Sequence, residues 1–499
     1  MQLVANGAQD VFLTNDPQIT FWKRAFKRHT NFSIESIAQT FTGGCQFGGE
    51  TNCQVIRSGD LIYKAYLEVQ LPEIKGTAPF SVEDVYQPYV GELLIDSVSI
   101  SIGGQVIDKH YGEWLHIWNE LSCKNREGYE RMVGKVVRSR TPVVFVPLSF
   151  WWNNSPGMAL PLIALQFHEV RLNFKFNDLS NLLTPEARKY HDENKTLFTT
   201  PQPYLNAKVF IDYVYIDMDE RTRFAQSTHE YLIQQVQKTS ESVRSENMRV
   251  PLNFNHPCKE LIWFVSDNQN EKKKFDFTYK NQADQDLDLD SFVKELKFAG
   301  TSTKDATGKV TTSSVAPEIS FDFSDRTGGG EKLFDSDFNS LSLNGKAVSG
   351  TTVYGDSTLQ GKLGNGVDNK VTFEKMVKHV LDYDLKVNLG PVTSALIKLN
   401  NHERFTARCG EYFNLVQPQQ HHTNTPRSNG LYVYSFALEP ESDQPTGSCN
   451  FSRIDNAVLE LTLHRAVALS GSTYKVTVYA TNFNVLRIMG GMGGVAFAN

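Results

Sequence analysis

Cysteine is scarce in this chain, and its spacing argues against a disulfide-bonded scaffold. The six cysteines among 499 residues form no CxxC pair, and the closest two, Cys45 and Cys53, are eight residues apart. Small secreted domains that depend on disulfides carry a much denser framework, and zinc sites need closer pairs. Reduced thiols in a cytosolic compartment are therefore the expectation.

An excess of either charge is also missing, as is any long apolar run. Lys and Arg number 50 and Asp and Glu 56, for a net charge of −6, while 40% of residues are hydrophobic and 21% charged. This composition excludes disorder over the whole length. The uncharged stretch 142–167 is broken by Pro, Asn and Gly before it could span a bilayer, and the first ten residues lack a signal-peptide pattern.

The motifs that most often reveal an enzyme are absent. The chain contains no Walker A, GxGxxG, GxSxG, HExxH or HxH pattern. His421 and His422 are adjacent, so in an extended loop they point apart, and hydrogen bonds that fix the loop are the better interpretation. Asp284, Asp286, Asp288, Asp290 and Glu295 follow a calcium-loop spacing, but Leu289 stands where such a loop needs Gly, which favours a solvated strand face. We therefore predict no catalytic, cofactor-binding or metal-binding residues.

The chain does contain segments in which apolar and polar residues alternate with period two, a pattern typical of half-buried strands. In 61–71, apolar residues occupy every second position, and polar residues occupy most of the others. Segments 170–176 and 457–464 alternate in the same way, and turn-rich intervals separate such segments. Helical periodicity is rare. The pattern predicts an all-β sandwich architecture.

The two halves of the chain resemble each other. The strand 97–105, followed by GEWLHIWNEL from Gly112, matches 394–402, followed by GEYFNLVQP from Gly410. An alternating strand (170–176 and 457–464) and a final Tyr- and Val-rich strand (207–217 and 474–486) follow in the same order. This order predicts duplication of one sandwich, with a linker near 218–235.

Residues 268–390 have a different composition. They contain runs such as GTSTKDATGKVTTSS and few long alternations. We interpret the segment as a large insertion between strands of the second sandwich, expected to project outward.

A basic and aromatic cluster lies near the amino terminus. Lys23, Arg24, Lys27 and Arg28 are interleaved with Phe21, Trp22, Ala25 and Phe26, and at helical spacing the two sets occupy opposite faces. Three interpretations stay open: a helix packed on its own domain, an arm that docks on a partner protein, and a contact with an acidic membrane or nucleic acid. The acidic overall balance argues against nucleic acid.

Four glycosylation sequons occur, at Asn31, Asn153, Asn194 and Asn450. They are candidate modification sites, although a chain without a secretory signal is not expected to be glycosylated by the conventional pathway.

Several blocks resemble the major capsid proteins of nucleocytoplasmic large DNA viruses. They include GAQDVFLTNDPQITFWKRAFKRHTNFSIESI (7–37), SGDLIYKAYLEVQLP (58–72), YFNLVQPQQHHTNTP (412–426), GLYVYSFALEPESDQPTGSCNFSRIDNA (430–457) and YATNFNVLRIMGGMGG (479–494). The resemblance covers nearly the whole chain except 268–390. Departures are modest: NDP at 15–17 where relatives often carry GNP, QPQQHH where QPYQHH is usual, and the long insertion.

This resemblance implies a double jelly roll, that is, two tandem eight-stranded antiparallel rolls with the large insertion in the second. The domain boundaries that we predict are an amino-terminal arm (1–30), a first roll (31–217), a linker (218–235) and a second roll (236–499) that carries the insertion 268–390. Three copies would form a pseudo-hexagonal capsomer.

The resemblance further implies a structural protein of the virion, assembled in the host cytoplasm, with no enzymatic activity, cofactor or direct nucleic-acid binding. The expected partners are two further copies, neighbouring capsomers, minor capsid and penton proteins, and an internal viral membrane nearby. We expect the arm, through Phe21, Trp22, Lys23, Arg24, Lys27 and Arg28, and the Gly-rich residues 490–499 to face the minor proteins. The alternatives are a carbohydrate-binding jelly roll and a cupin-like metalloenzyme.

Overall fold

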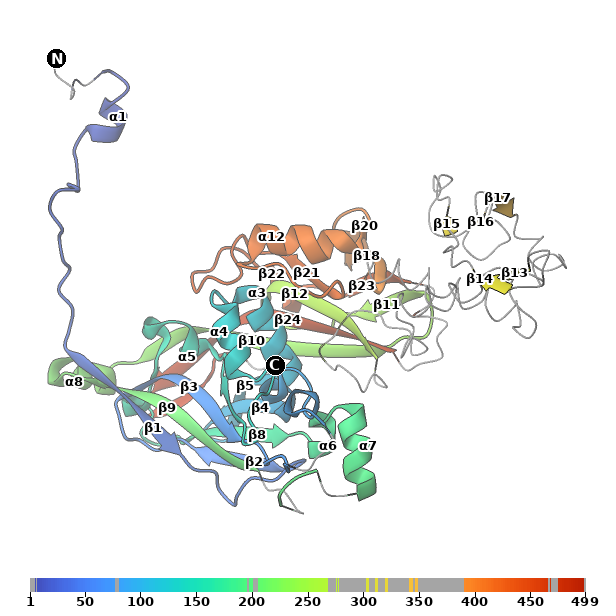
Figure 1. The fold of residues 1–499 in the computed structure, drawn as a ribbon. Helices are drawn as coiled ribbons and strands as arrows, with labels where there is room; N and C mark the ends of the chain where they lie inside the picture. The colour runs from blue at the N-terminus through green and yellow to red at the C-terminus, as the bar shows by residue number, and fades with distance from the viewer. Residues whose placement is uncertain are drawn as a thin grey trace.

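The computed structural model consists mainly of antiparallel sheets arranged as two rolls (Figure 1). It describes residues 5, 7–76, 80–194, 197–200, 205–267, 275, 277, 390–464, 467 and 474–497. Between 277 and 390 it describes only five short strands: β13 (Ser302–Lys304), β14 (Val310–Thr312), β15 (Ile319–Phe321), β16 (Leu341–Leu343) and β17 (Lys346–Val348). The expected insertion 268–390, and with it the acidic run 284–295, thus lies almost entirely outside the described residues.

Roll 1 is built from two facing sheets of four main strands each. One sheet has the order β1-β9-β3-β6, with the short β7 beside β3, and the other has the order β2-β8-β4-β5. The strands are β1 (Phe32–Gln39), β2 (Glu50–Gln54), β3 (Leu61–Gln70), β4 (Ile95–Ile102), β5 (Gln105–Tyr111), β6 (Val143–Pro147), β7 (Leu160–Pro161), β8 (Val170–Phe176) and β9 (Asn206–Ile216).

Roll 2 repeats this arrangement. Its sheets have the orders β10-β24-β12-β21 and β11-β23-β18-β19, with three short strands added at their margins. The strands are β10 (His229–Ser242), β11 (Asn247–Pro251), β12 (Pro257–Asp267), β18 (Val392–Leu399), β19 (His402–Glu403), β20 (Arg408–Cys409), β21 (Leu431–Ser435), β22 (Cys449–Asn450), β23 (Ala457–Leu463), β24 (Tyr474–Met489) and β25 (Met492–Val495). The predicted double jelly roll is confirmed.

The predicted internal repeat has a structural basis in the hairpins β4-β5 and β18-β19. Gly103 and Gly104 turn the first hairpin with φ of 57° and 85°, and Asn400 and Asn401 turn the second with φ of 50° and 64°. Two consecutive left-handed residues make the two-residue hairpin turn that matches the strand twist, and Gly and Asn are the residues that tolerate it best. The Gly-Gly to Asn-Asn change therefore preserves one turn geometry in both rolls.

The alternating segments form strands as predicted. Residues 170–176 alternate between buried and more exposed positions, and so do residues 457–463. Residues 61–70 form β3, but the pairing with β9 shifts between Ile62 and Ala65, so Ile62 is buried although it lies out of phase. A bulge of this kind inserts an extra residue that a strict period of two cannot anticipate.

Each roll has a core of its own between its sheets. The core of roll 1 includes Trp151, Trp152, Phe174 and Phe176. The core of roll 2 is centred on Trp263, which contacts the rings of Phe413 and Tyr432. Side chains of this size, fully removed from water, give each roll its main stabilisation.

Apart from α1, which lies in the amino-terminal arm before β1, the helices occupy the connections between strands. They are α1 (Val11–Thr14), η1 (Val82–Asp84), α2 (Val90–Leu94), α3 (Gly112–Ser122), α4 (Arg126–Met132), α5 (Trp151–Asn154), η2 (Pro156–Met158), η3 (Leu162–Ala164), α6 (Leu179–Leu182), α7 (Pro185–Asn194), α8 (Met218–Gln226), η5 (Tyr412–Val416), α12 (Gln417–His421) and η6 (Phe451–Arg453). The segment 218–235, expected to link the rolls, contains α8 and the first residues of β10.

The interpretation of residues 21–28 as a helix is wrong. These residues form a turn and extended chain, and the arm leaves roll 1 and runs away from both rolls (Figure 1). An eight-residue helix with nothing to pack against is marginal in water, because few hydrogen bonds offset the cost of nucleation.

Candidate assembly surfaces

The first candidate surface is the joint between the rolls, which α3 fills. Its apolar residues cover two faces, since Leu115 faces the core of roll 1 and Ile117 packs against roll 2. The roll 2 side is the outer face of its larger sheet, and the cluster comprises Trp114, Ile117, Leu121, Ile262, Phe264, Phe277, Leu431, Val433 and Tyr479. Buried Ile and Leu side chains each stabilise by about 1.5–3 kcal/mol, so this contact fixes the rolls to each other.

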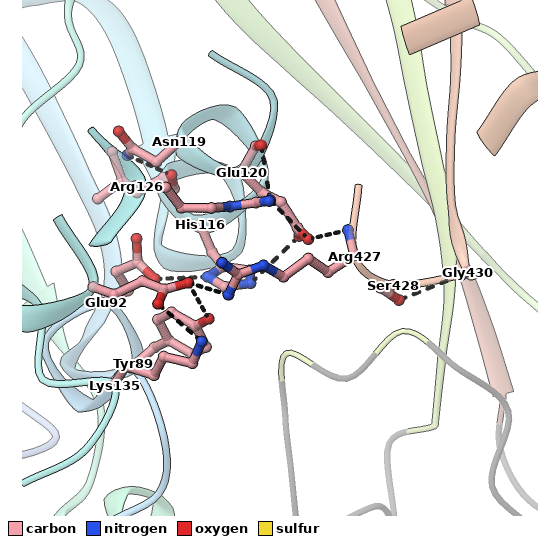
Figure 2. A network of polar contacts seen from close by, with 12 residues as sticks. Tyr89, Glu92, His116, Asn119, Glu120, Arg126, Lys135, Arg427, Ser428 and Gly430 are labelled. Carbon is pink, nitrogen blue, oxygen red and sulfur yellow. Dashed lines mark hydrogen bonds and ion pairs between the residues drawn. The ribbon is translucent and has the colours of Figure 1, made fainter. Parts of the chain in front are cut away.

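A polar network borders this joint (Figure 2). The carboxylate of Glu92 is buried and lies 2.8 Å from Nδ1 of His116, and it also accepts a hydrogen bond from the Tyr129 hydroxyl at 2.5 Å. From roll 2, Arg427 donates its backbone N–H to Glu120 at 2.7 Å and its guanidinium to Glu130. The arginine therefore reaches across the joint and binds two carboxylates of roll 1.

The roll 2 loop that carries Arg427 is also held to roll 1 by a backbone N–H and a side-chain amide of Asn424. Asn424 donates its N–H to the carbonyl of Leu121 at 2.9 Å and its side-chain amide to the carbonyl of Cys123 at 2.7 Å. These bonds satisfy carbonyls at the carboxyl end of α3 that have no partner within the helix. Burial alone would lower the pKa of His116. The neighbouring Glu92 carboxylate outweighs burial, so the pKa of His116 is raised from its ordinary value.

His422 begins this loop and is buried between two carboxylates. Its Nε2 lies 3.0 Å from Glu260 and its Nδ1 lies 3.0 Å from Glu441, and the His422 and Glu260 side chains are inaccessible to solvent. Burial opposes the charge, but Glu260 outweighs it and raises the pKa of His422 to about 9. The neighbouring His421 lies 2.9 Å from the carbonyl of Leu438 through Nδ1. The two histidines therefore hold this part of the chain through polar contacts, as predicted, although His421 is the last residue of α12 and does not lie in an extended loop.

A third contact joins β5 of roll 1 to β10 of roll 2. Gln235 donates its amide to the carbonyl of Ile107 at 2.5 Å, and the N–H of Val236 donates to Asp108 at 3.1 Å. The Asp108 carboxylate also lies 2.9 Å from Nε2 of His110. Polar groups buried this deeply must keep their partners, so the seam specifies one relative placement of the rolls.

The carboxy-terminal hairpin adds a fourth contact. Phe167 of roll 1 donates its N–H to the carbonyl of Gly491 at 2.9 Å, and the N–H of Gly493 donates to Nδ1 of His168 at 3.2 Å. A Cβ atom at Gly491 or Gly493 would lie under 3.0 Å from roll 1 side chains. A side chain at either position would displace a side chain of roll 1, and Gly491 also has the left-handed φ of 81° that favours glycine.

The arm residues predicted as assembly contacts are all exposed. Trp22 is 96% exposed and Phe21 90%, and Lys23, Arg24, Lys27 and Arg28 are exposed as well. Arg24 lies over the ring of Phe26, at 5.4 Å from its centroid. The structure keeps these residues together but brings none of them to the joint.

The sequon asparagines differ in their surroundings. Asn31 is exposed, and Asn194 is the last residue of α7. Asn153 accepts from the N–H of Phe150 and donates to the carbonyl of Tyr63, so its amide is part of the fold. Asn450 accepts from the N–H of Ser452 and caps η6.

Metal and membrane sites find no support in the described part of the chain. Within it, no group of three or more His, Cys, Asp or Glu side chains is placed to hold a metal ion. None of the helices within the described ranges is long and apolar enough to cross a membrane.

The joint residues were missed at the level of sequence. Glu92 and His116 are 24 positions apart, and Arg427 lies about 300 positions beyond them. One signal was present: GEWLHIWNEL carries more apolar residues than one buried face needs, which indicates a helix packed on two sides.

The chain matches two known families that together cover nearly all of it. Residues 220–494 match the large eukaryotic DNA virus major capsid protein family, and residues 20–217 match the major capsid protein N-terminus family. It is 40% identical to the major capsid protein of Phaeocystis pouchetii virus and 36% identical to that of Paramecium bursaria Chlorella virus 1. Each match covers 100% of this chain and 99% of the relative.

Solved structures agree with these matches. The PBCV-1 virus capsid superimposes with a TM-score of 0.65 at 31% identity, over 96% of this chain and 100% of that one. The Faustovirus major capsid protein superimposes with a TM-score of 0.60 at 12% identity, over 97% and 94%, a likeness of fold alone. The chain belongs to the family of major capsid proteins of large eukaryotic DNA viruses.

Proposed function

We propose that three copies of this chain form a six-sided capsomer that tiles an icosahedral shell. The observation that carries the proposal is the equal strand order of the two rolls, β1-β9-β3-β6 against β10-β24-β12-β21 and β2-β8-β4-β5 against β11-β23-β18-β19. Three chains with two similar rolls each present six similar edges, and cyclic symmetry closes such a ring.

The joint between the rolls supports a rigid tile. Apolar packing of α3, the Arg427 contacts, the β5-β10 seam and the carboxy-terminal hairpin hold the rolls at four places. A lattice of weak contacts needs units of constant shape, because each capsomer must meet several neighbours at once. The role is structural rather than catalytic, in keeping with the family.

The exposed arm supports a contact beneath the shell. Its aromatic side chains stay in water in the isolated chain, which is costly unless a partner covers them. We infer that the arm docks on minor capsid or penton proteins, near an internal membrane, in virions assembled in the host cytoplasm. No direct nucleic-acid contact is part of this proposal.

The mass of the purified chain in solution tests the proposal. Size-exclusion chromatography with light scattering is expected to give three times the chain mass of 56.3 kDa. A chain that remains a monomer at high concentration would contradict a permanent capsomer, because obligate interfaces of about 2,000 Å² or more do not dissociate readily.

A further inference from the structure

The helix that joins the rolls has a counterpart in roll 2. Residues 410–421 form one continuous helix through η5 and α12. A Cβ atom at Gly112, the first residue of α3, would meet the carbonyl oxygen of Ile95, the first residue of β4. A Cβ atom at Gly410 would meet that of Val392, the first residue of β18. The two helices therefore begin at equivalent places in their rolls.

Counted from these glycines, the faces toward each helix's own roll agree. Leu115 and Phe413 are equivalent, and each is fully buried in the core of its own roll. His116 and Asn414 are equivalent buried polar residues, and Asn414 donates to the carbonyls of Ser428 and Leu431. On this face of each helix, the apolar side chain is buried and the polar side chain finds its partners within its own roll.

The opposite faces differ. Ile117 is completely buried against roll 2, whereas its equivalent Leu415 is 49% exposed, and Val416, the equivalent of Trp118, is 41% exposed. Figure 1 shows α3 between the two rolls and α12 on the outer side of roll 2. The roll 2 helix therefore exposes Leu415 and Val416 at two positions that in α3 contact roll 2, whereas Tyr412, the equivalent of Trp114, packs on its own roll.

The matching sheet face is likewise open in roll 1. In roll 2, α3 packs on the row formed by Ile262, Val433 and Tyr479 across three paired strands. On the outer face of the equivalent sheet in roll 1, Tyr66, Pro147 and Phe210 form a similar row across three paired strands. Tyr66 stacks on Phe210 with ring centroids 5.2 Å apart, and its ring lies 6.2 Å from that of Phe145.

These aromatic residues are only half-buried, and Val143 on the same face is exposed. The face thus offers an apolar surface of the same kind that α3 covers in roll 2. An open helix face and an open sheet face on one chain are complementary in kind, and a contact already present within the chain shows how such faces pack.

We propose that the helix 410–421 of one copy packs through Leu415 and Val416 on the outer sheet face of roll 1 of a second copy, formed by Tyr66, Phe145 and Phe210. The contact between chains then repeats the joint within the chain. It is head-to-tail, so it continues until the ring closes. The inference rests on the proposed function and names the surfaces that the capsomer uses.

The test uses two double variants of the full chain and one control. L415D/V416D places charge on the helix face, and F145D/F210D places charge on the sheet face. L438D is the control, because Leu438 is 73% exposed on roll 2 and belongs to neither face. Near-ultraviolet circular dichroism compares the folded state of each variant with that of the wild type.

Light scattering is expected to give three chain masses for the wild type and L438D, and one for each double variant. An equal mixture of the two double variants retains one intact helix face and one intact sheet face, so it is expected to give two chain masses. A natively folded L415D/V416D that stays at three chain masses overturns the inference, and so does a mixture of natively folded variants that stays at one.

The same experiment separates the inference from the proposed function. A wild-type chain found at one chain mass refutes the capsomer itself and the inference with it. A wild type and double variants that all give three chain masses leave the capsomer standing and refute only the proposed surfaces.

Discussion

At the scale of single residues, the buried ion pairs around the joint have the clearest consequences. His422, Glu260 and Glu441 form one ionic group, with Lys259 beside it. Charges out of water depend on their partners, so removing one member leaves an uncompensated charge in the interior. The joint is therefore sensitive to single substitutions in roll 2.

His422→Gln is expected to lower the free energy of unfolding by about 3 kcal/mol, because Glu260 loses its charged partner. Urea unfolding of the purified protein measures the change. His421→Gln is the matched control and should cost less than about 1 kcal/mol, since it removes one contact to a carbonyl. Equal effects of the two variants would show that the buried pair contributes little.

The raised pKa of His422 also predicts a dependence on pH. Its folded pKa is about 9 against an ordinary 6.5, so the folded state holds a proton that the unfolded state releases. The stabilisation is complete below pH 6.5 and declines as pH rises toward 9. Burial lowers the pKa of Lys259 to about 8, which acts in the opposite sense above pH 8. The fall should therefore be steepest between pH 6.5 and 8.

Unfolding measured across this range in the wild type and in His422→Gln isolates the contribution, since Lys259 is common to both. The difference between the two proteins should shrink with increasing pH. A difference that stays constant from pH 6 to 9 would mean that His422 carries no extra proton in the folded state.

At the scale of elements, the strands could be predicted from sequence and the helices could not. Segments 170–176 and 457–463 alternate because one face of each is wet, which a sequence shows directly. α3 has apolar residues on two faces, so its helical period is obscured. The basic arm shows the reverse error: its period is helical, but residues 21–28 are all exposed in the described structure.

The candidate surfaces could not be predicted from the sequence for a different reason. Arg427 and Glu120 meet only because two rolls far apart in sequence lie side by side. Sequence pattern reports burial and period, but not which buried polar groups find each other. The internal repeat, by contrast, can be read from the sequence, and it identifies 410–421 as the equivalent of α3.

Gly410→Ala tests whether this helix is held as tightly as α3. A Cβ there would meet the carbonyl of Val392 and the ring of Tyr432, so overpacking should cost about 1–3 kcal/mol. Thermal unfolding is the measurement. Gly157→Ala is the control, because nothing lies within 4 Å of its added carbon. An unchanged melting temperature for Gly410→Ala would contradict the close approach.

At the scale of the whole molecule, the arm and the rolls have separable roles. Deleting residues 1–28 should leave the capsomer intact, because the arm belongs neither to the described joint contacts nor to the surfaces proposed for the contact between copies. Light scattering of the truncated chain is expected to match the wild type, while shells counted by electron microscopy of infected cells should become rare.

Replacing Lys23, Arg24, Lys27 and Arg28 with Gln, and keeping the aromatic residues, separates charge from apolar contact in the arm.

A truncated chain that no longer forms capsomers would show instead that the arm holds the copies together.

The central claim is that two rolls of one design let three chains act as six. Electron microscopy of purified capsomers, viewed along the threefold axis, tests it most directly. Class averages are expected to show six lobes of similar size, nearly unchanged by a 60° rotation. Averages with three lobes, or particles without a ring, would contradict the account.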